Sequence, residues 1–181
     1  MSGDVTAVRA VLQKFQDAYG ARDLTQLDAF MDLIVRGDDA ELIGIGASER
    51  GGSEWFQGRE AIRDIVASDW TYWGDVVLDV PSAKITLNGE TAWLSTTGAV
   101  VQVETFDAAM PQYLRQMADL LDEHDVDPDD RLMEATHFGL RRLRERFKGQ
   151  GHAWPLVFTA VLVRERANWR IHTMHWSMPV D

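Results

Sequence analysis

The stretch VVLDVPSAKITLNGETAWLSTTGAVVQVETF, residues 76–106, decides the fold class of this chain. Valine, leucine, isoleucine and threonine dominate it, and the β-branched residues among them favour strands. Asn88-Gly89 in its middle is the strongest two-residue signal for a hairpin turn. We therefore expect two paired strands, Val76–Leu87 and Thr91–Phe106, with Pro81 marking an edge position or a bulge in the first.

Helical patterns come before this hairpin. Asp4 and Asp23 are the expected caps of the first two helices, and the third is expected over Arg59–Trp73. A short strand is expected at Ala40–Ile45, followed by a glycine-rich loop. The apolar side of the first helix is formed by Val8, Val11, Leu12, Phe15 and Tyr19. Helices gathered before strands favour an α+β fold over an alternating α/β fold.

Two further strands are expected after the hairpin, Ala153–Arg166 and Trp169–Met178, joined by a tight turn. Two helical patterns interrupt the sheet before them, and Asp127 with Pro128 marks the start of the second. The sequence thus predicts one α+β domain over residues 1–181. A helical insertion at about 107–151 interrupts the strands of this domain.

Composition excludes several classes of function. The chain has 181 residues and a net charge of −11, so nucleic acid and anionic membrane surfaces are unsuitable partners. It has no cysteine, which excludes disulfides and thiolate chemistry and fits a reducing compartment. The N-terminal sequence lacks the pattern of a secretory signal, and no stretch has the length and apolarity of a membrane span. We therefore expect a soluble, cytoplasmic protein.

Two stretches resemble the SnoaL-like branch of the nuclear-transport-factor-two-like superfamily. ELIGIGASERGGSEWFQGREAIRDIVASDW, residues 41–70, is similar to that branch's strand, glycine-containing loop and Gly-Arg-Glu helix start. NWRIHTMHWSMP, residues 168–179, is similar to its closing strand. The resemblance implies a cone-shaped fold with a cavity, in which a curved antiparallel sheet wraps around the N-terminal helices. It does not select a function, because the superfamily contains isomerases, dehydratases, cyclases and modules that only bind or assemble.

Asp69 and His175 are the candidate catalytic residues. Asp69 shares the apolar side of its helix with Ile65, Trp70 and Trp73, where desolvation raises a carboxyl pKa toward the range of a general acid or base. An Asp69–His175 pair would suit proton transfer or dehydration. The alternatives are that Asp69 accepts a structural hydrogen bond and that His175 is only a hydrogen-bonded core residue.

The closing strand also supplies candidate ligand contacts. In a regular strand, residues three apart face opposite sides, so His172 and His175 should not share a metal ion. We expect His175 to face the cavity, and Met174 and Trp176 to face outward at an interface. No metal or nucleotide motif is found in the sequence, and no cofactor is expected. The predicted ligand-binding residues are Trp55, Trp70, Trp73, Trp154, Trp169, Thr173 and Ser177.

Three functions remain open at this stage. The first is binding of a small, largely apolar molecule in the cone. The second is cofactor-free isomerase, dehydratase or cyclase chemistry using Asp69 and His175. The third is an assembly module without catalysis. In each case we expect a homodimer packed through the sheets, to which the inserted helices could add.

Overall fold

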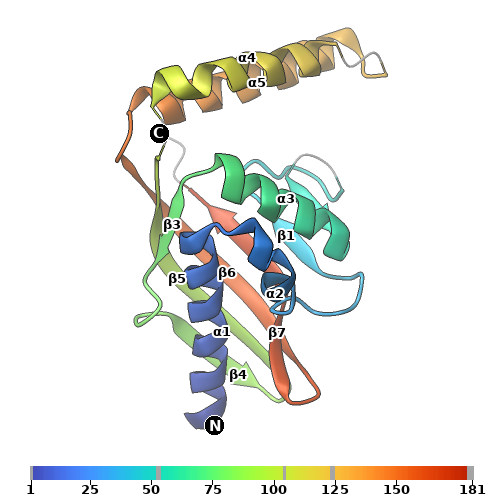
Figure 1. Cartoon of the computed structure of the whole chain (residues 1–181). Helices are drawn as coiled ribbons and strands as arrows, with labels where there is room; N and C mark the ends of the chain where they lie inside the picture. The colour runs from blue at the N-terminus through green and yellow to red at the C-terminus, as the bar shows by residue number, and fades with distance from the viewer. Residues whose placement is uncertain (1, 52–53, 104, 123–124, 179–181) are drawn as a thin grey trace. The chain divides into compact units, whose positions relative to one another are not determined.

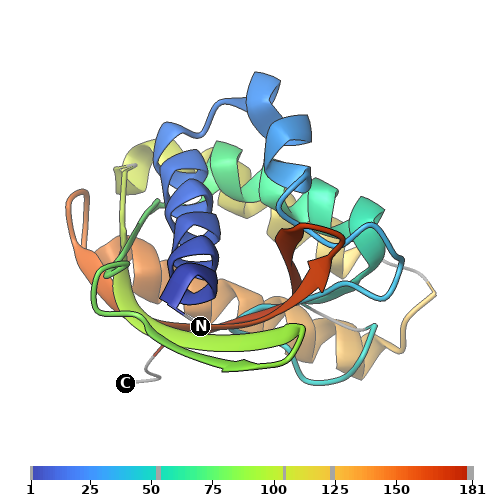
Figure 2. The same ribbon diagram turned by 90° about the horizontal axis from the view of Figure 1, so that it is seen from below.

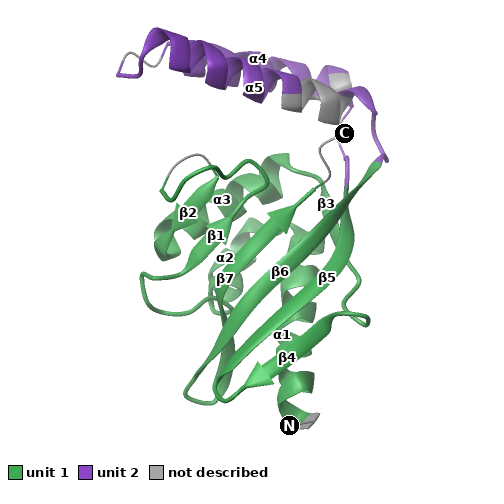
Figure 3. Ribbon diagram, turned by 180° about the vertical axis from the view of Figure 1, so that it is seen from behind, with its two compact units in different colours: residues 1–100, 153–181 green, residues 101–152 purple. Residues whose placement is uncertain are grey.

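The computed structural model describes residues 2–51, 54–103, 105–122 and 125–178. The chain divides into two compact units, shown in green and purple in Figure 3. The first comprises residues 1–100 and 153–181, and the second comprises residues 101–152. No helix in the described part of the chain combines the length and apolarity needed to cross a bilayer.

The first unit has helices on one side of a seven-stranded sheet (Figures 1 and 2). Its helices are α1 (Ser2–Ala21), the 3₁₀ turn η1 (Leu24–Gln26), α2 (Leu27–Met31) and α3 (Gly58–Tyr72). Its strands are β1 (Glu41–Ile43), β2 (Trp55–Gln57), β3 (Asp75–Leu78), β4 (Lys84–Asn88), β5 (Thr91–Val101), β6 (Ala153–Glu165) and β7 (Asn168–Ser177). Figure 2 shows α1 lying along the concave side of the curved sheet. The predicted α+β class and curved sheet are confirmed.

The strand order is β2-β1-β7-β6-β5-β3, with β4 also paired to β5. The β4–β5 and β6–β7 pairs are antiparallel, whereas β1 runs parallel to β7. The predicted strand Val76–Leu87 is two strands, because the chain turns at Pro81 and both halves pair with β5. The short edge strand β2 was not predicted from the sequence.

Close approach of two strands explains one glycine in β5. A Cβ added at Gly98 would lie 2.2 Å from the carbonyl oxygen of Val77 in β3. The predicted extension of this strand to Phe106 is wrong. Thr105 caps a helix there by accepting a hydrogen bond from the Ala108 amide, so the chain leaves the sheet after Val101.

Arginine side chains tie the helices to the rest of the first unit. Arg22, at the end of α1, donates to the carbonyl oxygens of Trp70 at 2.7 Å and Trp73 at 3.2 Å and pairs with Asp75 at 3.1 Å. These are the C-terminal carbonyls of α3, which a cation stabilises. Arg22 therefore fixes the ends of α1 and α3 side by side, and with them Tyr19 and Asp69.

A β-bulge changes the faces of the closing strand. Val161 pairs with Thr173 and Leu162 pairs with Ile171, so His172 is an extra residue in β7. The side-chain alternation is interrupted there, and both Ile171 and Met174 are buried. Our expectation that Met174 and Trp176 face outward is wrong: they are 0% and 2% exposed.

The second unit is a helical hairpin, α4 (Phe106–Leu121) and α5 (Pro128–Phe147). Asp127 accepts a hydrogen bond from the Asp129 amide at 2.9 Å, which confirms the predicted start of α5. The two helices approach closely at Gly139, where a Cβ would lie 3.0 Å from the Tyr113 hydroxyl and 3.1 Å from Met117 Sδ.

Candidate functional site

Aromatic rings from five elements meet on the inner side of the sheet. This aromatic cluster comprises Phe15, Tyr19, Phe30, Trp70, Trp73, Phe158 and Trp176. Trp176 is at its centre: its ring centroid lies 4.5 Å from that of Phe158, 5.6 Å from Trp73 and 5.7 Å from Tyr19. The bulge at His172 sets this position, because it reverses which residues of β7 face the helices.

One carboxylate lies at the edge of this cluster. Tyr19 donates its hydroxyl proton to Asp69 Oδ2 at 3.1 Å. Tyr19 is buried, whereas Asp69 is partly exposed. Asp69 reaches Tyr19 because it lies on the same side of α3 as Val66 and Trp70, as helical spacing predicts. Of the alternatives considered for Asp69, a structural hydrogen bond is therefore present, and Tyr19 is its donor.

The environment keeps Tyr19 protonated. Burial raises its pKa well above the ordinary value of 10.0. The negative charge of Asp69 raises the pKa further, and so does the hydrogen bond to that carboxylate. Tyr19 is therefore a neutral hydrogen-bond donor at all physiological pH values.

Two indole groups in the cluster have unused donors. The Nε1 atoms of Trp70 and Trp176 are buried and have no hydrogen-bond partner among the described residues. Leaving such a donor unsatisfied costs about 1–3 kcal/mol. The donors lie in rings that flank Tyr19 at centroid distances of 6.1 Å and 5.7 Å. The cluster is therefore apolar in bulk but rich in hydrogen-bond donors.

The structure does not bring Asp69 and His175 together. His175 lies between the buried residues Met174 and Trp176, and so points to the opposite face of β7. In the sheet, His175 is paired with Thr159 of β6 and with Ile43 of β1. The expectation that His175 faces inward, toward the cavity, is wrong, and the physical reason is the bulge, which shifts the alternation by one residue.

The predicted ligand-binding residues are divided between several places. Trp70 and Trp73 belong to the aromatic cluster, and Trp154 lies on the same side of β6 as Phe158 by alternation. Trp55 is on the edge strand β2, with Arg50 5.6 Å from its ring centroid. Trp169 is at the start of β7, under Arg164 at 4.7 Å.

Thr173 and Ser177 lie on the same outer face of β7 as His175, away from the cluster, because all three follow the bulge at alternate positions. The expectation that they face inward is wrong as well. Thr173 Oγ1 lies 2.9 Å from His172 Nδ1, and the other nitrogen of that ring lies 3.2 Å from Asp39. Bulge residues on one side of a strand can contact each other in this way.

Sequence reasoning missed Tyr19 and Trp176 as site residues. Tyr19 was read as part of an apolar helix face, although a tyrosine there signals a buried hydroxyl that needs an acceptor. The alternation of the strand predicts that Trp176 faces outward, and nothing in the sequence signals the bulge. The signal for Asp69 was sound, because a carboxylate on an apolar helix face requires a partner.

Comparisons with known proteins agree with this fold. The family model described as a SnoaL-like domain matches residues 8–118. An NTF2-like family protein from Streptomyces avermitilis has a TM-score of 0.62 at 13% identity, over 99% of each chain. A ketosteroid isomerase-like protein from Erwinia carotovora atroseptica has a TM-score of 0.60 at 12% identity, over 100% of each chain.

A cystatin-like-fold protein from Nostoc punctiforme has a TM-score of 0.59 at 10% identity, covering 99% of this chain and 93% of its own. At these identities the structures show the fold alone. No curated protein sequence matches the chain. The family match spans most of the first unit's helices and strands, and the structural neighbours cover the remainder. This chain belongs to the SnoaL-like domain family, within the NTF2-like, cystatin-like fold.

Proposed function

We propose that the protein binds a small, largely apolar molecule on the inner side of its sheet, at the aromatic cluster. The observation that carries this proposal is the Tyr19–Asp69 hydrogen bond beside the unpaired indole donors of Trp70 and Trp176. Ligand sites in proteins combine mainly apolar and aromatic walls with a few placed polar groups. The cluster has this composition.

The donors and the carboxylate define the ligand chemistry. A carbonyl or ether oxygen would accept from an indole N–H and remove the cost of an unpaired donor. A hydroxyl on the same molecule would donate to Asp69 at the partly exposed edge of the cluster. A net anionic ligand would be repelled by Asp69. We therefore propose a neutral molecule with an apolar ring or chain and at least one oxygen acceptor.

Binding is tested with prodan, a neutral naphthalene ketone whose emission moves to shorter wavelengths in apolar sites. We expect saturable binding to the wild-type chain. Trp176→Phe keeps the ring but removes the donor, so we expect the Kd to rise about fivefold for the loss of one neutral hydrogen bond. Trp169→Phe is the matched control, because its Nε1 is also buried and unpaired but belongs to another part of the strand.

Two results would contradict this proposal. One is the absence of saturable prodan binding up to a Kd of about 1 mM, which corresponds to roughly 4 kcal/mol of binding free energy. The other is an equal loss of affinity in Trp176→Phe and Trp169→Phe, which would place the probe elsewhere.

A second candidate function is cofactor-free acid–base catalysis of the isomerase, dehydratase or cyclase type. The hydrogen bond between Tyr19 and Asp69 favours it, because a neutral tyrosine beside a carboxylate pairs a donor with a base. Asp69 would act as the base without His175. Deuterium exchange into 2-tetralone, followed by NMR, tests this function: the wild type should accelerate exchange and Asp69→Asn should not.

A further inference from the structure

The described side chains of the helical hairpin bury little apolar surface. Of its described side chains in residues 101–152, Ala135 is the one buried apolar residue. The contacts between its helices include the stacked rings of Tyr113 and Phe138, 6.3 Å apart, the close approach at Gly139, and a hydrogen bond from Arg131 to the Leu121 carbonyl oxygen at 3.0 Å. Isolated pairs of helices with so little buried surface are marginal in water.

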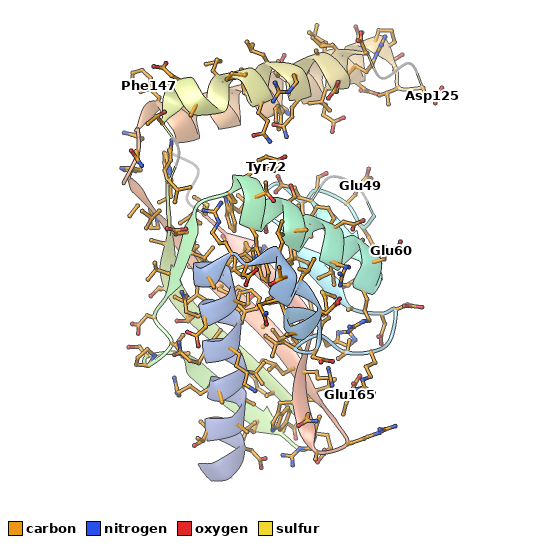
Figure 4. All side chains as sticks on the ribbon, viewed as in Figure 1. Glu49, Glu60, Tyr72, Asp125, Phe147 and Glu165 are labelled. Atoms are coloured by element: carbon orange, nitrogen blue, oxygen red, sulfur yellow. The ribbon has the colours of Figure 1, made fainter. Side chains whose placement is uncertain are left out.

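Large apolar side chains of the hairpin are exposed instead. Leu132, Leu140 and Phe147 of α5 are 60%, 66% and 84% exposed, and Leu114 and Leu121 of α4 are also exposed. These five residues are the apolar stripe. Figure 4 labels Phe147 at the C-terminal end of α5, opposite the end near Asp125. Spacings of seven or eight residues keep the members of each helix on one side of it.

The two helices present their parts of the stripe on the same side of the hairpin. Tyr113 and Met117 of α4 face Gly139 of α5, and the buried Ala135 lies one turn earlier on the same side of α5. At 100° per residue, the stripe on each helix lies roughly a quarter turn from these facing positions, in the same rotational sense. Because the helices are antiparallel, equal rotations place both parts on one side. The hairpin therefore has one continuous apolar face.

The charge of α5 is divided along its length. By sequence, its first half carries the acidic residues Asp129, Asp130 and Glu134 and one arginine, Arg131. Its second half carries four arginines, at positions 141, 142, 144 and 146, and one glutamate at position 145, and Lys148 follows the end of the helix. A second copy of α5 laid antiparallel across the first would set acidic ends against basic ends, and it would also oppose the helix dipoles. A parallel copy would set like charges together.

We propose that the apolar stripe binds the same stripe of a second copy of this chain. The two hairpins form an antiparallel four-helix bundle around a two-fold axis near Leu140. In this arrangement Leu132 of one copy lies against Phe147 of the other, because Leu140 is midway between them. The contact is isologous, as two-fold symmetry requires. The proposal is independent of ligand binding in the first unit.

The size of the face is sufficient for such a dimer. Helices of 16 and 20 residues are about 24 and 30 Å long, and two side by side are about 20 Å wide. The face thus measures roughly 500–600 Å² per copy, and a dimer buries somewhat more than 1,000 Å² in total, the lower limit of specific interfaces. We expect a reversible dimer with a Kd in the micromolar range.

The oligomeric state of the full chain is the first test. Sedimentation equilibrium should show a dimer that Leu132→Glu/Leu140→Glu weakens at least about 100-fold, since each copy buries two new charges. Val157→Glu is the control, because Val157 is also an exposed apolar residue, at 44%, but lies on the outer face of the sheet. It should leave the dimer intact. Circular dichroism confirms that each variant is folded.

Cross-linking tests the antiparallel geometry, because the chain has no cysteine of its own. Leu140→Cys lies at the proposed axis and should form an intermolecular disulfide on mild oxidation. Leu132→Cys should not, since antiparallel copies hold the two sites about 24 Å apart along the bundle.

Four results would overturn the proposal. A wild-type chain that stays monomeric at about 100 µM would do so, because it puts the Kd above the expected range. A monomer that Leu132→Glu/Leu140→Glu destabilises would show the stripe packing within its own chain. Equal cross-linking at positions 132 and 140 would indicate parallel copies. Dissociation by Val157→Glu alone would place the interface on the sheet.

Discussion

Helix α1 and helix α5 have the same kind of sequence and opposite environments. Each is 20 residues long with a regular apolar side. In α1, Val8, Leu12 and Phe15 are at most 1% exposed against the sheet. In α5, the corresponding residues form the exposed apolar stripe. The difference teaches that amphipathic spacing identifies the apolar face of a helix, but does not tell whether the rest of the same chain covers it.

A substitution in the core against which α1 packs should cause the largest loss of stability. Phe15→Ala removes a ring that contacts Tyr19, Phe30, Phe158 and Trp176. We expect a loss of about 3–5 kcal/mol in the free energy of unfolding, measured with urea.

Phe147→Ala is the matched change in the hairpin, where the ring is exposed. At a protein concentration low enough to keep the chain monomeric, it should change the unfolding free energy by less than about 0.5 kcal/mol. Similar losses in the two variants would show that the stripe is covered within one chain.

Two glycines, one in the sheet and one in the hairpin, allow the rigidity of packing in the two regions to be compared. In the sheet, Gly98→Ala sets a Cβ against a backbone oxygen at 2.2 Å, so β3 and β5 must separate. We expect a loss of about 1–3 kcal/mol in unfolding free energy.

In the hairpin, Gly139→Ala meets the ends of the Tyr113 and Met117 side chains at 3.0–3.2 Å, which can move. Alanine also favours the helix by up to about 1 kcal/mol, so the net change should be near zero. Thermal denaturation of both variants is the measurement. A larger loss of stability in Gly139→Ala than in Gly98→Ala would mean that the hairpin is packed more rigidly at Gly139 than the sheet is at Gly98.

The hydrogen bond between Tyr19 and Asp69 is tested by Tyr19→Phe, which keeps the ring and removes only the hydroxyl. The lost hydrogen bond to Asp69 should lower the unfolding free energy by about 1 kcal/mol at pH 7. The pKa of Tyr19 is raised in the folded state, so its contribution is complete below pH 10 and is lost as the pH rises further.

Urea unfolding from pH 7 to pH 11 measures this dependence. The wild type should lose stability above about pH 10, where unfolded tyrosine ionises. Tyr19→Phe should lose less over the same interval. Identical pH dependence in the two proteins would mean that the Tyr19 hydroxyl is not held in its buried, protonated state.

Much of the fold could be predicted because its signals are local. The caps at Asp23 and Asp127, the Asn88-Gly89 turn and the helix over residues 59–73 all depend on neighbouring residues, and the structure confirms them within one or two positions. The candidate site could be predicted only in part. Asp69 was recognisable from its helix face, but its partner Tyr19 is 50 residues away in sequence.

The errors have non-local causes. Pro81 was recognised as irregular, but the break into β3 and β4 depends on how both halves pair with β5. The reversal of His175 and Trp176 depends on one extra residue, His172, in the pairing of β7 with β6. A single-residue shift moves every later side chain to the other face, and nothing in the strand's own sequence records it.

The sequence by itself determined the fold class, the order of the elements, the family resemblance and the apolar faces of the helices. Each of these follows from spacing and turn chemistry within a few residues. Only the tertiary structure decided that Trp176, and not His175, joins Tyr19 and Asp69, and that the apolar face of α5 lies exposed. Both outcomes depend on pairing between distant segments, and local sequence preferences do not contain that information.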